Sequence, residues 1–546
     1  MNSVTVALIL LLTVVVSGSL TRALPVPVPL PLVQIALGAF IASVADLGVE
    51  LKPEIFFLLF LPPLLFLDGW RIPKEGLFHD KGTILELALG LVVLTVIGVG
   101  FLINWMIPAM PLAVAFALAA IVSPTDPIAV SAIAARVPIP SRLMHILEGE
   151  SLLNDASGLV CMRFAVVAAL TGTFSLVDAV GTFLWVAIGG VAIGVAVTSG
   201  VTYAKGWISR RLGEETGSQI LISLLIPFGA YLLAERLHCS GILAAVGAGI
   251  TMSYSEQTGQ ALATTRMRRT AFWDTIQFAA NGVIFVLLGE QLPTILAGAA
   301  QVVSQTGHHE PVWLVVYIIA INAALAALRF LWVWVSLRFT LYRAARRGQA
   351  IQRPSWRLVA ATSLAGVRGA VTLAGVLTLP LTLNDGSAFP ARDLAILLAA
   401  GVIIVSLVAA SLGLPVLLKG LALPPEPSQR AEEDRARLVA ARAAIRSIEQ
   451  AQHALGEGRS DADLYADAGA RIMELYRQRI DRGSKSRDEA DLIRKVDHIE
   501  RELRLSGIRA ERDMYYRLAR KRRVSDDMAR KLVRELDLIE ARFASG

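Results

Sequence analysis

Long apolar stretches alternate with short polar ones along residues 1–423 of the chain. A helix needs roughly 20 apolar residues to cross a bilayer core of about 30 Å. About thirteen stretches meet or approach this length: 3–20, 29–45, 54–70, 83–107, 111–135, 146–170, 178–201, 218–235, 239–253, 274–297, 312–337, 357–381 and 394–418. The pattern predicts an all-α, polytopic membrane protein. The first stretch lacks a Lys or Arg before its apolar run, so we interpret it as a retained span.

A polar region follows the apolar body. The segment Leu423-Pro-Pro-Glu-Pro427 is typical of a linker. Beyond it, helical patterns cover about 431–456, 461–481, 486–518 and 525–543. In the last of these, Ser525 is placed as an N-cap, and one apolar stripe is expected. That stripe consists of Met528, Leu532, Leu536, Ile539 and Phe543. The chain is therefore divided into a transmembrane domain, 1–423, and a helical cytoplasmic tail, 424–546, for which regulation is a plausible role.

Composition supports the membrane assignment and excludes several other classes. The chain is 55% hydrophobic and 18% charged, whereas soluble proteins are about 45–50% apolar and about 25% charged. No zinc-ligand spacing or RNA-binding signature accompanies the net charge of +7, so no nucleic-acid partner is expected. Cys161 and Cys239 both lie in apolar segments, which excludes a disulfide scaffold and a cysteine-ligated metal cluster. We expect no cofactor.

The loop charges predict an orientation. Most loop Lys and Arg residues fall in alternate loops, and only Lys52, Arg236 and Arg392 fall in the others. Because positive loops remain in the cytoplasm, the N-terminus is expected outside and the polar tail inside. The chain is thus expected to be a multi-pass protein of the plasma (inner) membrane, in contact with its lipids.

Several ionisable residues fall inside the predicted spans. They are Asp68, Glu86, Asp126, Glu150, Asp155, Arg163, Glu290, Arg329 and Arg368. Such residues are costly to bury in a bilayer, so each is a functional candidate with an expected partner. For Glu86, Arg163, Glu290 and Arg329, which lie near span ends, we favour snorkelling or a structural ion pair.

The sixth span contains a polar run from Glu148 to Gly158. At 3.6 residues per turn, Glu150 and Asn154 share one stripe of the helix. Ser151 and Asp155 share the neighbouring stripe. Carboxylate, hydroxyl and amide oxygens are the ligands that hard cations prefer. Polar contacts between packed helices would also explain Ser151 and Asn154, but they fit a deeply placed Asp155 poorly.

Two further spans carry motifs typical of interrupted helices. In Ser123-Pro-Thr-Asp-Pro127 the two prolines predict unwinding, which places Thr125 and Asp126 in the break. Asp126 then either contacts an ion directly or neutralises half-helix N-termini. In the twelfth span, Arg368 cannot be neutralised by deprotonation and needs an acidic partner, for which Glu150 is the candidate. If helices 1–6 and 8–13 are inverted repeats, these two interrupted helices correspond and cross near the membrane midplane.

Together these motifs resemble the sodium/proton exchanger family of monovalent cation:proton antiporters, especially bacterial members with a hydrophilic tail. The matching segments are Leu61-Pro-Pro-Leu-Leu-Phe-Leu-Asp-Gly-Trp70, Ser123-Pro-Thr-Asp-Pro127, Glu150-Ser-Leu-Leu-Asn-Asp155 and Gly366-Val-Arg-Gly369. The resemblance implies that Asp155 is the main ion and proton carrier and that Ser151, Thr125 and Asp126 contribute to the ion site. It also implies that Glu150 and Arg368 form a structural pair and that the protein is a homodimer.

One position departs from the family pattern. Several members have an acid four positions beyond the second proline of the third span, where this chain has Leu67. The acid of this chain, Asp68, comes one place later, so its contact with the ion is an open question. We expect Na⁺ to be held through Asp155, Thr125 and Ser151, with Asn154 in the same site.

The expected function is Na⁺/H⁺ exchange that serves sodium transport and pH homeostasis, without enzyme activity. Burial disfavours the ionised form of Asp155, and a nearby Na⁺ favours it, so proton and cation compete for one carboxylate. Because the amide of Asn154 can neither take up nor release a proton, one cation is expected to exchange for one proton. K⁺/H⁺ exchange and a passive cation channel stay open as alternatives. An intramembrane hydrolase built on Ser151, Asp155 and His145 lacks the Gly-x-Ser-x-Gly elbow.

Overall fold

The structure is a computed structural model with two compact units, Met1–Leu421 and Ala422–Gly546, which are described separately. The described residues are 3–25, 28–44, 53–72, 81–126, 130, 141–171, 176–213, 215–257, 263–305, 312–346, 355–383, 385–419, 429–457, 462–483 and 487–544. Within them the regular structure is helical, apart from one isolated bridge between Thr382 and Ala388. The all-α prediction is confirmed.

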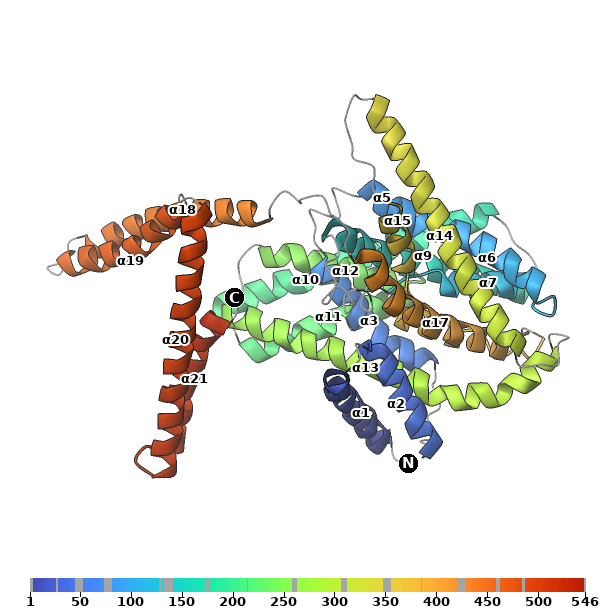
Figure 1. Cartoon of the computed structure of the whole chain (residues 1–546), viewed down its shortest axis with the longest axis horizontal. Helices are drawn as coiled ribbons and strands as arrows, with labels where there is room; N and C mark the ends of the chain where they lie inside the picture. Colours follow the sequence, from blue (N-terminus) through green and yellow to red (C-terminus); the bar gives the residue numbers. More distant parts are fainter. Residues whose placement is uncertain are drawn as a thin grey trace. The chain divides into compact units, whose positions relative to one another are not determined.

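The helices of the first unit form two groups, which contact each other chiefly through α13 and α17 (Figure 1). The first helix group consists of α1 (Ser3–Ala23), α2 (Leu30–Val44), α3 (Pro53–Arg71), α10 (Leu176–Leu212), α11 (Thr216–Arg236), α12 (Gly241–Gln257) and α13 (Ala263–Gln305). The second helix group consists of α5 (Lys81–Leu85), the π-helix η1 (Glu86–Leu91), α6 (Val92–Met106), α7 (Leu112–Val122), α9 (Ser141–Thr171), α14 (Val312–Arg346), α15 (Trp356–Leu364), α16 (Ala370–Leu377) and α17 (Arg392–Leu418).

Every apolar stretch expected to span the membrane contains helix. Among the described residues, eight helices are long and apolar enough to cross a bilayer. Others are shorter, such as α2 and α7, because they have fewer apolar residues or are interrupted. The presence of many apolar helices is therefore confirmed, whereas the count of thirteen spans stays a prediction.

Two interrupted helices meet inside the second helix group. One helix, α7, ends at Val122 and is followed by the non-helical residues 123–126. The chain is interrupted again between α15 and α16. The backbone N–H of Asp126 donates to the carbonyl of Val367 at 2.7 Å, so the two breaks lie against each other. The predicted meeting of two interrupted helices is confirmed, and its place at the membrane midplane stays a prediction. Pro127 lies outside the described residues, and the inverted-repeat symmetry stays a prediction.

Glycine allows α3 and α12 to pack closely in the first helix group. A Cβ atom added at Gly249 of α12 would collide with the backbone carbonyl of Phe66 in α3. Because a backbone carbonyl cannot rotate away as a side chain can, a larger residue would force the helices apart. This contact fixes the position of α3, which carries Asp68.

In its described residues the second unit has four helices, as the sequence predicts: α18 (Gln429–Gly456), α19 (Ala462–Gly483), α20 (Arg487–Arg520) and α21 (Asp526–Ala544). Within this unit α18 packs on α19, and α20 packs on α21 (Figure 1). The predicted N-cap is confirmed, because the Ser525 hydroxyl accepts a hydrogen bond from the N–H of Met528 at 3.3 Å.

The apolar stripe expected on α21 is partly wrong. Its buried face is formed by Ala529, Val533 and Leu536, whereas Met528 and Ile539 are each 48% exposed. Because α21 packs mainly on one helix, α20, the buried stripe is narrow. It is centred one residue away from the expected positions.

We expect Gly249→Ala to lower the stability of the purified protein by about 1–3 kcal/mol, because the new methyl group overpacks the α3–α12 contact. The matched control is Gly200→Ala in α10, where an added Cβ meets no atom within 4 Å. That change should be neutral or stabilising by up to about 1 kcal/mol, because alanine is the better helix former. Thermal unfolding in detergent measures both. Equal melting temperatures for the two variants would contradict the prediction.

Candidate functional site

A cavity of about 30 Å³ lies where the two helix groups meet. It is lined by Leu61, Leu64, Leu65 and Asp68 of α3, by Asn281 of α13, by Pro124, Thr125 and Asp126 of the first break, by Ser151 and Asp155 of α9, and by residues 369–372 at the start of α16. This volume is sufficient for a water molecule or a small cation.

Three carboxylates line this cavity: Asp68, Asp126 and Asp155. They come from α3, the first break and α9, so the fold gathers acids that are far apart in the sequence. Thr125 and Ser151 add hydroxyl oxygens to the same lining. Carboxylates gathered in a poorly solvated space repel one another, so bound positive charge is favoured there. The predicted neighbours of Asp155 are thus brought together, and Asp68 joins them.

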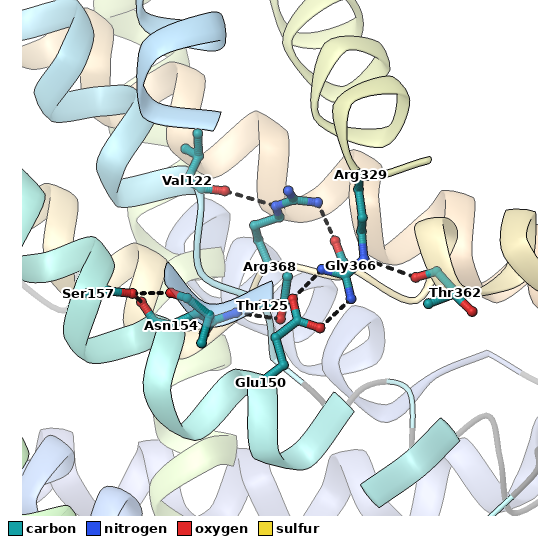
Figure 2. A network of polar contacts seen from close by, with 10 residues as sticks. Val122, Thr125, Glu150, Asn154, Ser157, Arg329, Thr362, Gly366 and Arg368 are labelled. Atoms are coloured by element: carbon teal, nitrogen blue, oxygen red, sulfur yellow. Dashed lines mark hydrogen bonds and ion pairs between the residues drawn. The ribbon is translucent and has the colours of Figure 1, made fainter. Parts of the chain in front are cut away.

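Asn154 supports the cavity but is absent from the residues that line it. Its Nδ2 donates a hydrogen bond to Thr125 Oγ1 at 2.9 Å (Figure 2). Because this bond holds the hydroxyl of Thr125, Asn154 positions a lining residue. One turn further along α9, Ser157 Oγ donates to the carbonyl of Ala88 in the π-helix η1 at 2.6 Å. These two bonds connect α9 to the first break and to η1.

The buried ion pair differs from the expected one. Glu150 accepts two hydrogen bonds from the guanidinium of Arg329, one of them at 2.6 Å from Nη2 to Oε2 (Figure 2). Arg329 Nε also donates to the carbonyl of Thr362 at 3.0 Å. Both charged side chains are buried, at 1% and 3% exposure. The predicted Glu150–Arg368 pair is therefore wrong, because Arg329 of α14 presents the bidentate geometry that a carboxylate prefers.

Arg368 bonds to backbone carbonyls instead. Its Nε donates to Val122 at 2.9 Å, and its Nη1 donates to Gly366 (Figure 2). Val122 is the last residue of α7, and Gly366 follows the end of α15. The C-terminal end of a helix leaves carbonyls unsatisfied and carries partial negative charge. Arg368 thus neutralises the ends of two interrupted helices.

Asp126 lies at the start of α16. A Cβ atom added at Gly369, the N-cap of that helix, would collide with the Asp126 carboxylate. The absence of a side chain at Gly369 therefore lets the acid approach the positive end of the helix. Because Asp126 also lines the cavity, ion contact and neutralisation of a half-helix N-terminus are both compatible with this placement.

Other intramembrane charges have local partners. Arg163 donates to Glu235 at 3.2 Å, and the Ser336 hydroxyl donates to Glu86 at 3.1 Å. Gln291 donates to Glu290 at 2.6 Å. The Arg163–Glu235 pair agrees with the structural interpretation of these residues. Glu86 and Glu290 accept from neutral side chains, and Glu290 is buried rather than snorkelling, so the interpretation of these two acids stays a prediction. Arg329 also has a structural partner, although it is buried rather than snorkelling.

The sequence interpretation missed two polar residues of the lining, Asn281 and Thr372. Asn281 interrupts an apolar run in α13 and carries no charge, so a search for ionisable residues passes over it. A search for any polar residue in an apolar helix would have found it. Thr372 lies beyond the Gly366-Val-Arg-Gly369 motif, and its position depends on the interruption between α15 and α16.

Comparison with known proteins assigns the chain to a family. Residues 7–420 match the family described as "Sodium/hydrogen exchanger, transmembrane". The chain belongs to this family. It is 41% identical over 539 residues to the uncharacterized Na(+)/H(+) exchanger YjcE of Escherichia coli, covering 98% of this chain and 97% of the relative. It is 37% identical to the sodium, potassium, lithium and rubidium/H(+) antiporter of Bacillus subtilis, over 98% of this chain and 78% of that protein.

A solved structure supports the fold of this exchanger. The sodium proton antiporter MjNhaP1 from Methanocaldococcus jannaschii matches 77% of this chain and 98% of its own, with a TM-score of 0.58 and 18% identity. At this identity the match shows the fold alone. The resemblance inferred from the four motifs is confirmed by the family match, and the chain is an integral membrane protein with several apolar helices.

The Glu150–Arg329 pair generates a stability prediction. Removing either charge leaves the other buried without a partner, so Glu150→Gln and Arg329→Met should each destabilise the protein by about 3–5 kcal/mol. The double variant should lose much less than the sum of the two. As a control, Arg504→Ala breaks the exposed Glu500–Arg504 pair and should cost about 0–0.5 kcal/mol.

Unfolding in detergent measures these energies as a double-mutant cycle. A second cycle that pairs Glu150→Gln with Arg368→Met should show weaker coupling, because Arg368 is bonded to carbonyls. Stronger coupling in the second cycle than in the first would contradict the assignment of Arg329 as the partner.

Proposed function

We propose that this protein is a secondary active antiporter that exchanges Na⁺, or another monovalent cation, for H⁺ across the membrane. The observation that carries the proposal is the cavity in which Asp155, Ser151 and Thr125 lie together at the meeting of two helix groups. Family membership and the names of the relatives support cation/proton exchange. These relatives are transporters by name, which disfavours a hydrolase that uses Ser151.

Competition at Asp155 is the proposed coupling step. Asp155 is 5% exposed, so its negative charge must be either balanced by a bound cation or removed by protonation. A Na⁺ ion bound beside the carboxylate would take oxygen ligands from Ser151 and Thr125. A proton on the same carboxylate removes the charge that attracts the cation. The site therefore holds one or the other.

Alternating access would convert this competition into exchange. The cavity has one wall from each helix group, so a shift of one group past the other would change which side of the membrane the site faces. If only the cation-bound and protonated states make this shift, each cation that moves one way is matched by a proton that moves the other way. A passive channel would lack this obligatory coupling.

One-for-one exchange follows if Asp155 alone changes its charge during the cycle. Arg329 and Glu150 form a closed pair, and Asn154 carries no titratable proton. Asp68 and Asp126 must then keep one protonation state in both loaded forms. On this basis the transport is electroneutral.

The cation is proposed to be Na⁺, with K⁺ as the alternative. The printed name of the Bacillus subtilis relative includes sodium, potassium, lithium and rubidium, which favours a broad monovalent specificity. We also propose that the protein is a homodimer in the plasma membrane, with the N-terminus outside and the tail in the cytoplasm. The distribution of loop Lys and Arg residues supports this orientation.

Asp155→Asn is expected to abolish cation-driven proton movement, because the amide can neither release a proton nor neutralise a cation. The assay is the pH change inside proteoliposomes when Na⁺ or K⁺ is added outside. Asp393→Asn is the control, since that carboxylate is 81% exposed at the start of α17, and its activity should match the wild type. Transport by Asp155→Asn at more than a small fraction of the wild-type rate rejects the carrier assignment.

Competition also predicts the sign of the pH dependence. As pH falls, protons occupy Asp155, so the apparent KM for the cation should rise by up to about tenfold per pH unit. The maximal rate at saturating cation should change less than the KM over the same range. A KM that is independent of pH would contradict competition at one carboxylate. In the same proteoliposomes, electroneutral exchange should build up no membrane potential after a Na⁺ jump, which a voltage-sensitive dye measures.

A further inference from the structure

Among the polar residues that line the cavity, Asn281 and Thr372 have no role in the proposed mechanism, and of these two Asn281 lies in the first helix group. It lies in α13, between the buried residues Ala280 and Gly282, where the helix becomes a buried apolar run, and it is itself half-buried. Among the described residues that line the cavity, it is the one supplied by α13. Its side chain therefore adds an amide to a wall that otherwise consists of leucines and Asp68.

The carbonyl oxygen of this amide lacks a hydrogen-bond donor. Asn281 Oδ1 is buried and accepts no bond from any residue that the structure describes. A buried carbonyl without a partner is costly, and most such groups in native proteins are satisfied. An apolar side chain at this position would avoid that cost. The unpaired oxygen is therefore explained by a partner that enters the cavity.

A cation fits this oxygen better than a proton does. Amide oxygens bind hard cations through their partial negative charge, yet they do not take up protons at ordinary pH. An amide can therefore replace part of the hydration shell of the ion without adding another titratable group. Such a ligand would change cation affinity and selectivity while leaving the proton count unchanged.

We propose that Asn281 is a cation ligand from the first helix group, which completes the site formed by Asp155, Ser151 and Thr125. This inference rests on the proposed function and adds a specificity-determining residue to it. Because Asn281 and Asp155 belong to different helix groups, the ion would be held between the two walls. The contact would then exist only while the groups are aligned as in the present structure.

The test compares two substitutions at Asn281 with a matched control. Asn281→Ala removes the oxygen and should raise the apparent KM for Na⁺ by about tenfold, the loss expected for one oxygen contact to a charge. The maximal rate should stay within about twofold of the wild type. Asn281→Asp has the same shape and retains the oxygen, so its KM should not rise. The control is Asn322→Ala of α14. This amide donates to the carbonyl of Ile318 at 2.9 Å and does not line the cavity, so its loss should leave the KM for Na⁺ unchanged.

The cation series provides a second readout that a packing role would not change. Li⁺ and Na⁺ are smaller than K⁺ and depend more on replacement of their hydration shells by protein oxygens. Asn281→Ala should therefore raise the KM for Li⁺ and Na⁺ more than the KM for K⁺. An unchanged KM, or a fall in maximal rate that is equal for all three cations, would overturn the assignment.

Binding can be measured even where transport is weak. Na⁺ should raise the melting temperature of the purified wild type in a concentration-dependent way, and Asn281→Ala should shift this curve to higher Na⁺. An unshifted curve would overturn the proposal. The outcomes also separate the two hypotheses. If the wild type shows no coupled exchange, the proposed function fails; if the wild type exchanges ions and Asn281→Ala matches it, only this inference fails.

Discussion

Backbone groups freed by an interrupted helix have no water to bond with inside a bilayer, so the protein must satisfy them itself. The site of this exchanger depends on how that requirement is met. Arg368 supplies donors to the carbonyls of Val122 and Gly366, and the N–H of Asp126 bonds to Val367. These contacts stabilise two interruptions against each other. The resulting open backbone gives Thr125 and Asp126 a place in the cavity.

Permanent and exchangeable charges are kept apart around this crossing. Glu150 and Arg329 form a closed buried pair, and Arg368 is occupied by helix ends. Their hydrogen bonds fix them in place and leave them little freedom to respond to an ion. The carboxylates of the cavity face a space large enough for a water molecule or a small cation. Charge that varies during transport can therefore be confined to the cavity, while the surrounding charges maintain its shape.

Sequence reasoning recovered the parts of the molecule that depend on local pattern. Apolar length predicted the helices, and the spacing of Ser151 and Asp155 placed them one turn apart on α9. The family motifs identified most of the lining. The pairing of Glu150 was missed because Arg329, 179 residues away, is brought close only by the packing of α14. Asn281 was missed because it is uncharged, and only the folded structure shows that it lines the cavity.

The difference between contacts within and between the helix groups explains how the proposed exchange can be both mobile and coupled. Within the groups, hydrogen bonds and close backbone contacts, such as that of Gly249 with Phe66, are directional and resist sliding. Between the groups, Arg163 of α9 donates a hydrogen bond to Glu235 of α11, but this pair is partly exposed. At the cavity, Leu61, Leu64 and Leu65 present an apolar wall. Apolar contacts are non-directional and permit movement, but an uncompensated carboxylate is costly to move past them. The same leucines would therefore allow the loaded site to pass and hold back the empty, ionised one.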